Sequence, residues 1–201
     1  MINYIFFDRG EVLTTIGTKN IIIKRIMDEF NLDRQIVLDT FDSHTQNLDR
    51  GVITEAEFWS NFLEDLGLDP KTPHNIDLCE IYRINTKINS STFEIAEELR
   101  NKGYRMGIIT NTILSIHEYN QIIGLYNGFN PVVASCDVKY MKPEIQIYQL
   151  ALEKVKQDPK HCLFIDDKEK FLEPASSLGM KTIHYTSSSR LEKELRALKV
   201  L

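Results

Sequence analysis

The second half of the chain alternates short apolar runs with longer amphipathic segments, and this alternation constrains the fold more than any other feature. Residues 104–110 (YRMGIIT) have the length and composition of a buried strand, whereas residues 91–101 carry apolar side chains at helical spacing. The same criteria predict further strands at 131–135, 162–165 and 181–184, and further helices at 144–155, 171–178 and 190–198. Strands that alternate with helices of this length form βαβ units, so the sequence predicts an α/β fold with a parallel sheet.

The first half of the chain follows a different pattern. Residues 3–7 (NYIFF) form an apolar run that predicts one more buried strand, which ends at Asp8. The stretch from 17 to 85 is helical and poor in strands, and Thr54 with Glu57 forms a capping box that predicts the start of one of its helices. We therefore expect a helical insertion, residues 15–86, between the first strand and the rest of the sheet, with residues 1–14 and 87–201 forming the core.

Polar residues lie at the ends of three of the predicted strands and in the loop after a fourth. In parallel sheets the carboxyl ends of the strands meet at one edge, where ligands bind. Three carboxylates, a lysine, a hydroxyl and an amide would meet there, a set that suits a hard cation and a phosphate group. Each residue alone also has an ordinary structural interpretation, as a helix cap or a turn residue, and the joint occurrence in this order favours a site. The residues are Asp8, Thr110, Asn111, Lys142, Asp166 and Asp167.

The segments that carry these residues resemble the haloacid dehalogenase superfamily over nearly the whole chain. The matching segments are FFDRGEVL, IITNT, MKPEIQIY and FIDDKEKFLEPASSLGM. They look most like the branch that holds glucose 1-phosphate phosphatase and the N-terminal phosphatase domain of soluble epoxide hydrolases. The resemblance implies a three-layer, Rossmann-like parallel sheet with a small helical cap inserted after the first strand.

The resemblance also implies a role for each residue of the site. Asp8 would be the nucleophile that is transiently phosphorylated, and Lys142 would be catalytic and would bind the substrate phosphate together with Thr110 and Asn111. Mg²⁺ would be the cofactor. Its ligands would be the Asp8 carboxylate, the main-chain carbonyl of Gly10 and Asp167, with Asp166 next to them. The expected activity is that of a Mg²⁺-dependent phosphatase acting on a small phosphorylated metabolite, with sugar phosphates as one candidate class.

Gly10 departs from the pattern of such phosphatases, which carry a second aspartate at this position as the general acid and base. Proton transfer of this kind contributes roughly 10²- to 10⁴-fold in rate. Three explanations stay open at this point. One is that the leaving group needs little protonation. Another is that a residue such as Glu11 or His44 replaces the missing acid, and the third is that the reaction is not phosphoryl transfer. If the reaction is not phosphoryl transfer, the protein would be a 2-haloacid dehalogenase, which needs no metal, or a degenerate family member that binds a phosphometabolite without turnover.

Two further features concern the surroundings of the site. His44, Gln46, Asn47 and Arg50 lie in the part of the expected cap that is able to overhang the site. Phe171 stands where the related branch usually has an asparagine that braces the loop, so we expect a structural adjustment there and no loss of metal.

Composition narrows the class of protein. The net charge of −5 argues against a nucleic-acid partner, because such proteins usually carry a basic face. No apolar run approaches the length of a membrane span, and the N-terminus has no signal-peptide pattern. The three cysteines are widely spaced and fit reduced thiols. We expect a cytoplasmic protein, a monomer or a homodimer, whose partner is a small phosphorylated metabolite.

Overall fold

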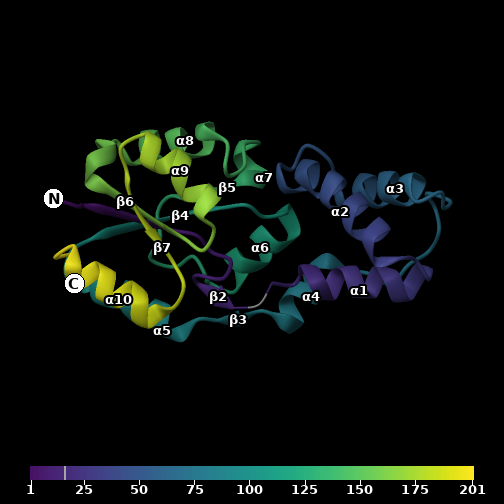
Figure 1. Ribbon diagram of the computed structural model, residues 1–201, viewed down its shortest axis with the longest axis horizontal. Coiled ribbons are helices and arrows are strands. Elements are labelled where there is room, and N and C mark those ends of the chain that lie inside the picture. Colours follow the sequence, from purple (N-terminus) through teal and green to yellow (C-terminus); the bar gives the residue numbers. More distant parts are fainter. Residues whose placement is uncertain (16) are drawn as a thin grey trace.

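The computed structural model describes residues 1–15 and 17–201, and a parallel five-stranded sheet forms its centre (Figure 1). The strand order is β5-β4-β1-β6-β7, with β1 in the middle. Residue 16, the second residue of the expected insertion, lies outside the described residues. The strands are β1 (Tyr4–Phe7), β4 (Arg105–Thr110), β5 (Val132–Ala134), β6 (Cys162–Asp166) and β7 (Lys181–His184). The predicted α/β class and each predicted strand are thus confirmed, with ends that differ by at most one residue.

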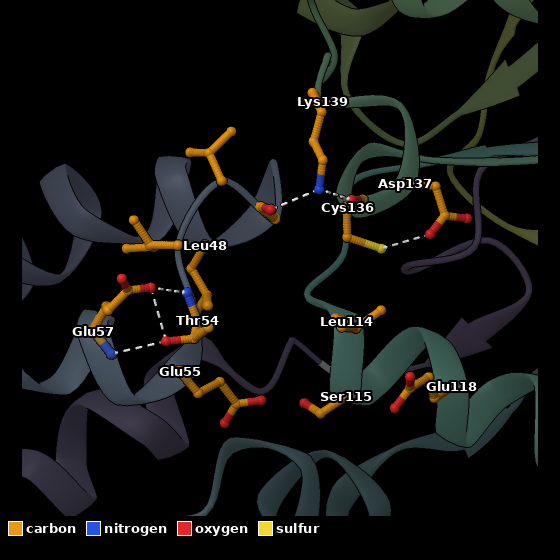
Figure 2. Close-up of a pocket in the computed structure, with 13 residues that line it drawn as sticks. Leu48, Thr54, Glu55, Glu57, Leu114, Ser115, Glu118, Cys136, Asp137 and Lys139 are labelled. Carbon is orange, nitrogen blue, oxygen red and sulfur yellow. Dashed lines mark hydrogen bonds between the residues drawn. The ribbon is translucent and has the colours of Figure 1, made fainter.

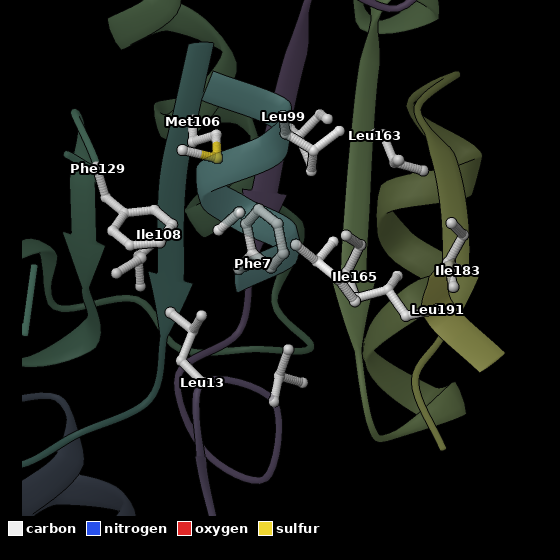
Figure 3. Close-up of a cluster of buried hydrophobic side chains, with 14 of the residues drawn as sticks. Phe7, Leu13, Leu99, Met106, Ile108, Phe129, Leu163, Ile165, Ile183 and Leu191 are labelled. Carbon is white, nitrogen blue, oxygen red and sulfur yellow. The ribbon is translucent and has the colours of Figure 1, made fainter. Parts of the chain in front are cut away.

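Helices cover both faces of this sheet, which gives three layers (Figure 1). Alternate residues of β1 explain why: Ile5 and Phe7 belong to one hydrophobic cluster, whereas Tyr4 and Phe6 belong to another. The first cluster, drawn in Figure 3, packs against α5 (Ser90–Asn101) and α10 (Ser188–Ala197). The second packs against α8 (Ile145–Val155) and α9 (Glu169–Ser177). The predicted three-layer, Rossmann-like core is therefore correct.

Several short elements connect these layers. Helix α6 (Leu114–Ile122) follows β4 and was not expected from the sequence, since no side chain caps its first turn. Helix α7 (Ser135–Val138) follows β5 directly, and a short 3₁₀ helix (Pro159–His161) precedes β6. These connections place the carboxyl ends of β4, β1 and β6 side by side at one edge of the sheet.

The insertion after β1 is helical, as the sequence predicts, and its described residues form four helices. They are α1 (Lys19–Phe30), α2 (Arg34–Asp49), α3 (Glu55–Asp65) and α4 (Leu78–Asn85). Their apolar faces share a separate hydrophobic cluster, and the capping box of Thr54 and Glu57 begins α3. Two short antiparallel strands, β2 (Thr14–Thr15) and β3 (Lys87–Ile88), pair where the chain leaves and re-enters the core. The insertion lies at the end of the molecule opposite both termini (Figure 1).

Helix α2 extends well beyond the apolar periodicity of its sequence. The apolar periodicity stops near Phe41, but the helix continues to Asp49. The added turns are mostly polar, and Leu48 is the only buried side chain that they contribute among the described residues. This extension carries the C-terminus of α2 to the core beside α7 (Figure 1). None of the described helices is long and apolar enough to cross a bilayer.

Candidate active site

Asp8 lies at the carboxyl end of the central strand and is 6% exposed. Its amide donates to the carbonyl of Ile165 at 2.8 Å, which extends the pairing of β1 with β6 by one residue. The chain then turns sharply, because the carbonyl of Arg9 accepts from the amides of Leu13 (3.0 Å) and Thr14 (2.9 Å). This turn fixes the carboxylate of Asp8 at the sheet edge and leaves Gly10 beside it.

Lys142 reaches Asp8 from the loop between α7 and α8. Its Nζ lies 2.7 Å from Oδ1 of Asp8 and 2.6 Å from Oδ2 of Asp166, and the side chain is 1% exposed. Burial alone would lower the pKa of Lys142, but the carboxylates of Asp8 and Asp166 together raise it above its ordinary value. Lys142 is therefore an ammonium group held between two carboxylates.

Three carboxylates converge here, because oxygens of Asp8, Asp166 and Asp167 lie within 4.8 Å of one another. Burial raises the pKa of Asp166 to about 6, although Lys142 opposes the shift, and burial also raises the pKa of Asp167. Oδ1 of Asp167 is buried without a hydrogen-bond partner among the described residues. Three carboxylates around one ammonium leave excess negative charge in a buried place, which is costly without a further cation. The set of oxygens fits a hard divalent cation such as Mg²⁺.

Gly10 lines the same cleft as Asp8. A Cβ built on Gly10 would meet only Oδ2 of Asp8, at the ordinary contact distance of 3.8 Å. The geometry therefore has room for a side chain at position 10. The role of its carbonyl as a metal ligand stays a prediction.

Thr110 and Asn111 lie at the end of β4, where the sequence placed them. Asn111 forms two hydrogen bonds with the main chain of Lys142: its Nδ2 donates to the carbonyl at 2.9 Å, and its Oδ1 accepts from the amide at 2.8 Å. Thr110 is 1% exposed, and its hydroxyl donates to the carbonyl of Asn111 at 3.3 Å. Asn111 thus anchors the loop of Lys142 and lines the cleft, whereas Thr110 is buried and is not among the described residues that line it. Their contact with a phosphate stays a prediction.

Phe171 closes the site from α9. Its ring centroid lies 5.0 Å from Nζ of Lys142, within the range of a cation–π contact. Its carbonyl accepts from the hydroxyl of Tyr148 at 2.7 Å. The aromatic ring covers the lysine where a polar brace was expected, and the carboxylate cluster is intact beside it.

A cleft of about 400 Å³ opens above Asp8, and a second compartment of about 300 Å³ extends from it beneath the insertion. The two share several lining residues, so the compartments adjoin. Core residues supply one wall of the space, and the insertion supplies the other. The shared residues are Arg9, Thr18, Lys19, Asp49, Asn111 and Ile116. A space of this size suits a small metabolite.

The C-terminus of α2 is fastened to the core by three contacts, which we call the α2 clamp. The hydroxyl of Ser135 donates to the carbonyl of Asp49 at 2.5 Å, and Arg50 pairs with Glu144. Lys139 donates from Nζ to the carbonyl of Gly51 at 2.6 Å and to that of Cys136 at 2.8 Å (Figure 2). The clamp borders a separate pocket of about 590 Å³, drawn in Figure 2.

The cap residues expected to overhang the site do not line this cleft in the described structure. His44 pairs with Asp65 at 2.8 Å inside the insertion, and Arg50 pairs with Glu144 in the clamp. Neither Gln46 nor Asn47 is among the described residues that line the cleft. Asp49 and Lys19 lie there instead, and no motif in the sequence predicts a role for either. No sequence signal marks Asp49, because its position depends on contacts between α2 and α7.

A family model for haloacid dehalogenase-like hydrolases matches residues 2–179. The chain belongs to this family. The match confirms the resemblance that the four segments predicted. It also agrees with the parallel sheet described above.

Sequence and structure comparisons give more distant likenesses. The chain is 27% identical over 192 residues to bifunctional epoxide hydrolase 2 of Rattus norvegicus, across 87% of this chain and 35% of that protein. It thus spans about a third of that relative. It is 25% identical to glyceraldehyde 3-phosphate phosphatase of Methanothermobacter thermautotrophicus, across 78% of this chain and 67% of that protein. The expected likeness to epoxide hydrolases is confirmed.

Among solved structures, the chain resembles a HAD family enzyme of Bacteroides thetaiotaomicron in its magnesium complex. The TM-score is 0.72 at 23% identity, over 92% of this chain and 93% of that one. At this level of identity the likeness shows a shared fold.

Proposed function

We propose that this protein is a Mg²⁺-dependent phosphatase that hydrolyses a small phosphorylated metabolite through an aspartyl phosphate on Asp8. The observation that carries the proposal is the pairing of Lys142 with Asp8 and Asp166, beside a third carboxylate, at the floor of a cleft. A nucleophilic carboxylate, a fixed cation and a set of metal ligands are what this chemistry requires. The phosphatase and magnesium-bound proteins that resemble the chain support the same conclusion.

The chain's own residues divide the work. Asp8 attacks phosphorus and forms the acyl phosphate, and Lys142 stabilises charge on both the nucleophile and the phosphate oxygens. Asn111 fixes the loop of Lys142 through its two main-chain hydrogen bonds, and we propose that Asn111 and Thr110 also donate to phosphate. Water then attacks the acyl phosphate and restores the carboxylate of Asp8.

The carboxylates of Asp8 and Asp167 and the carbonyl of Gly10 would hold Mg²⁺, with Asp166 beside them. The partnerless buried oxygen of Asp167 supports this ligand set, because such an oxygen is costly unless it binds something. When bound, Mg²⁺ supplies charge stabilisation for the transferring phosphoryl group. Asp166 itself is occupied by Lys142 and by the amide of Lys168, which donates to its Oδ1 at 2.9 Å.

We also propose that residues 15–86 act as a cap and residues 1–14 and 87–201 as the catalytic core. The separate hydrophobic cluster of the insertion and the paired strands β2 and β3 at its base support this division. A wall contributed by the insertion would exclude bulk water from the reacting phosphate and select small substrates. Sugar phosphates are one class that fits the space.

A panel of phosphorylated metabolites, assayed for phosphate release with and without Mg²⁺, tests the proposal. We expect turnover that requires Mg²⁺ and that falls by at least about 10⁴-fold in Asp8→Asn. Equal rates for the wild type and Asp8→Asn on every substrate would contradict it. Halide release from 2-haloacids that is insensitive to chelation would instead favour the dehalogenase alternative. Binding of phosphometabolites without turnover would favour a non-catalytic member.

A further inference from the structure

Position 10 leaves the proposed reaction without its usual proton donor. Gly10 has no side chain, and an unactivated alkoxide is a poor leaving group unless it is protonated as it departs. The group that replaces the missing aspartate must line the cleft above Asp8 and face the leaving oxygen. In the described structure, two carboxylates besides that of Asp8 line this cleft: Glu11 and Asp49.

Glu11 is placed poorly for this role. Its side chain is exposed, and its main chain has a left-handed conformation, with φ of +58°. Its Oε1 lies close to Gly17, 3.4 Å from the place of a Cβ on that residue. The carboxylate therefore lies beside Gly17, which follows β2, at the solvent side of the cleft. His44, paired with Asp65, does not line the cleft at all.

Asp49 is placed well, because it belongs to the wall that faces the sheet edge. It is the last residue of α2 and lines both compartments of the cleft. It is also the only carboxylate of the described insertion that lines the compartment of Asp8. A substrate whose phosphate rests on Asp8 would extend its leaving group into the space that Asp49 borders.

The α2 clamp holds Asp49 in this position through the main chain and through its neighbours. The hydroxyl of Ser135 binds the carbonyl of Asp49, and Lys139 binds that of Gly51. Neither contact uses the carboxylate of Asp49. Its side chain is therefore positioned by the core yet free to exchange a proton, as a general acid and base requires.

The charges around Asp49 act in opposite directions. Burial raises the pKa of Asp49 to about 6, whereas Arg9, Lys168 and Arg50 lower it. A carboxyl group that titrates near this pH exists in both forms under ordinary conditions and can donate and accept a proton in turn. The other charged groups that line the two compartments are Asp8, Glu11, Lys19, Asp42 and Lys142.

We infer that Asp49 is the general acid and base of the proposed phosphatase, in place of a side chain at position 10; the inference rests on the proposed function. As the oxygen of Asp8 bonds to phosphorus, the bond to the leaving oxygen breaks, and the carboxyl proton of Asp49 passes to that oxygen, which releases an alcohol. The carboxylate of Asp49 then takes a proton from water. The water oxygen bonds to phosphorus, the Asp8–phosphorus bond breaks, and phosphate leaves.

Leaving-group dependence tests this role, because only a proton donor makes the rate insensitive to the acidity of the leaving phenol. The measurement is kcat/KM for a series from 2,4-dinitrophenyl phosphate to phenyl phosphate, in wild type, Asp49→Asn and the matched carboxylate variant Glu11→Gln. For Asp49→Asn we expect a loss of about 10²- to 10³-fold on phenyl phosphate and less than about tenfold on the dinitrophenyl ester. Glu11→Gln should keep the wild-type dependence.

The second step gives an independent readout. With the dinitrophenyl ester, Asp49→Asn should release one equivalent of phenol in a burst and then turn over slowly, because water is no longer activated. Asp49→Glu should recover part of the rate on phenyl phosphate. A decrease in kcat/KM above about pH 6 in the wild type should be absent in Asp49→Asn and present in Glu11→Gln.

Other outcomes would overturn the inference. An equal loss across the whole series in Asp49→Asn would mean that the residue only maintains structure. A leaving-group-dependent loss in Glu11→Gln and not in Asp49→Asn would assign the acid to Glu11. If wild type and Asp8→Asn are equally inactive on every ester, the proposed function fails and the inference with it, which is distinguishable from loss in Asp49→Asn alone.

Discussion

The proposed catalytic residues on the two walls of the cleft are held in position in different ways. On the core side, Asp8, Lys142 and Asp166 are buried, and Lys142 pairs directly with both carboxylates. On the side of the insertion, Asp49 is only partly buried, and its position depends on the α2 clamp. The groups that would act on phosphorus thus belong to a preassembled cluster, whereas the group that would move the proton is delivered by a long helix. This difference predicts that substitutions in the two walls have separable effects on stability, metal binding and turnover.

The largest effect is expected on the core side, from Lys142→Met. Removing the ammonium leaves Asp8 and Asp166 buried and unpaired, so we expect a loss of about 3–5 kcal/mol in the free energy of unfolding together with loss of turnover. Lys139→Met is the matched control, since it removes a lysine of the clamp that is exposed and binds only carbonyls. We expect it to cost about 1 kcal/mol. Urea unfolding measures both values, and equal losses would contradict the difference between the walls.

Magnesium should stabilise the core wall selectively. At a concentration about 100 times its dissociation constant, Mg²⁺ should raise the free energy of unfolding by about 2.7 kcal/mol. Asp167→Asn should lose most of this gain, because it removes a proposed ligand, whereas Asp49→Asn should retain it. Denaturant unfolding with and without Mg²⁺ measures the gain. A loss in Asp49→Asn as large as that in Asp167→Asn would show that the two walls form one metal site.

The clamp itself is tested by Gly51→Ala. Gly51 has φ of +61°, and a Cβ there would lie 2.5 Å from the carbonyl of Cys136, so the helix end must shift. We expect a loss of about 2–3 kcal/mol in the free energy of unfolding and a lower kcat on phenyl phosphate. Gly67→Ala is the control, because Gly67 also has positive φ (+72°) but has no atom within 4 Å of the added Cβ. It should cost about 1 kcal/mol and leave kcat unchanged, and identical kinetics for both variants would argue against the clamp.

The smallest expected effect is the pH dependence of stability contributed by Asp49. Its folded pKa is raised to about 6, so the folded state holds the proton more tightly than the unfolded state. The carboxylate therefore destabilises the fold progressively as pH rises from about 4 to about 6. Relative to Asp49→Asn, the wild type should lose about 1–2 kcal/mol of unfolding free energy over this range. A difference that stays constant or grows in favour of the wild type would show that the carboxylate is stabilised in the fold.

The residues of the core wall could be predicted from the sequence, because parallel strands bring their carboxyl ends to the same edge of the sheet. The order of strands and polar residues along the chain was enough to place Asp8, Lys142 and Asp166 together. Asp49 could not be placed in this way, since the turns of α2 beyond Phe41 are mostly polar and carry little periodicity. The helix continues to Asp49 because its end packs against α7, and this packing brings Asp49 to the cleft. Helix α6 was missed for a similar reason, because no side chain caps its start.

The central claim is that Asp8 carries the phosphoryl group, and trapping tests it most directly. Asp49→Asn, mixed with 2,4-dinitrophenyl phosphate and Mg²⁺ and quenched in acid during the burst, should yield a peptide containing Asp8 with the added mass of one phosphoryl group. The double variant with Asp8→Asn should yield none. Release of phenol with no phosphorylated Asp8 at any time point would contradict the account.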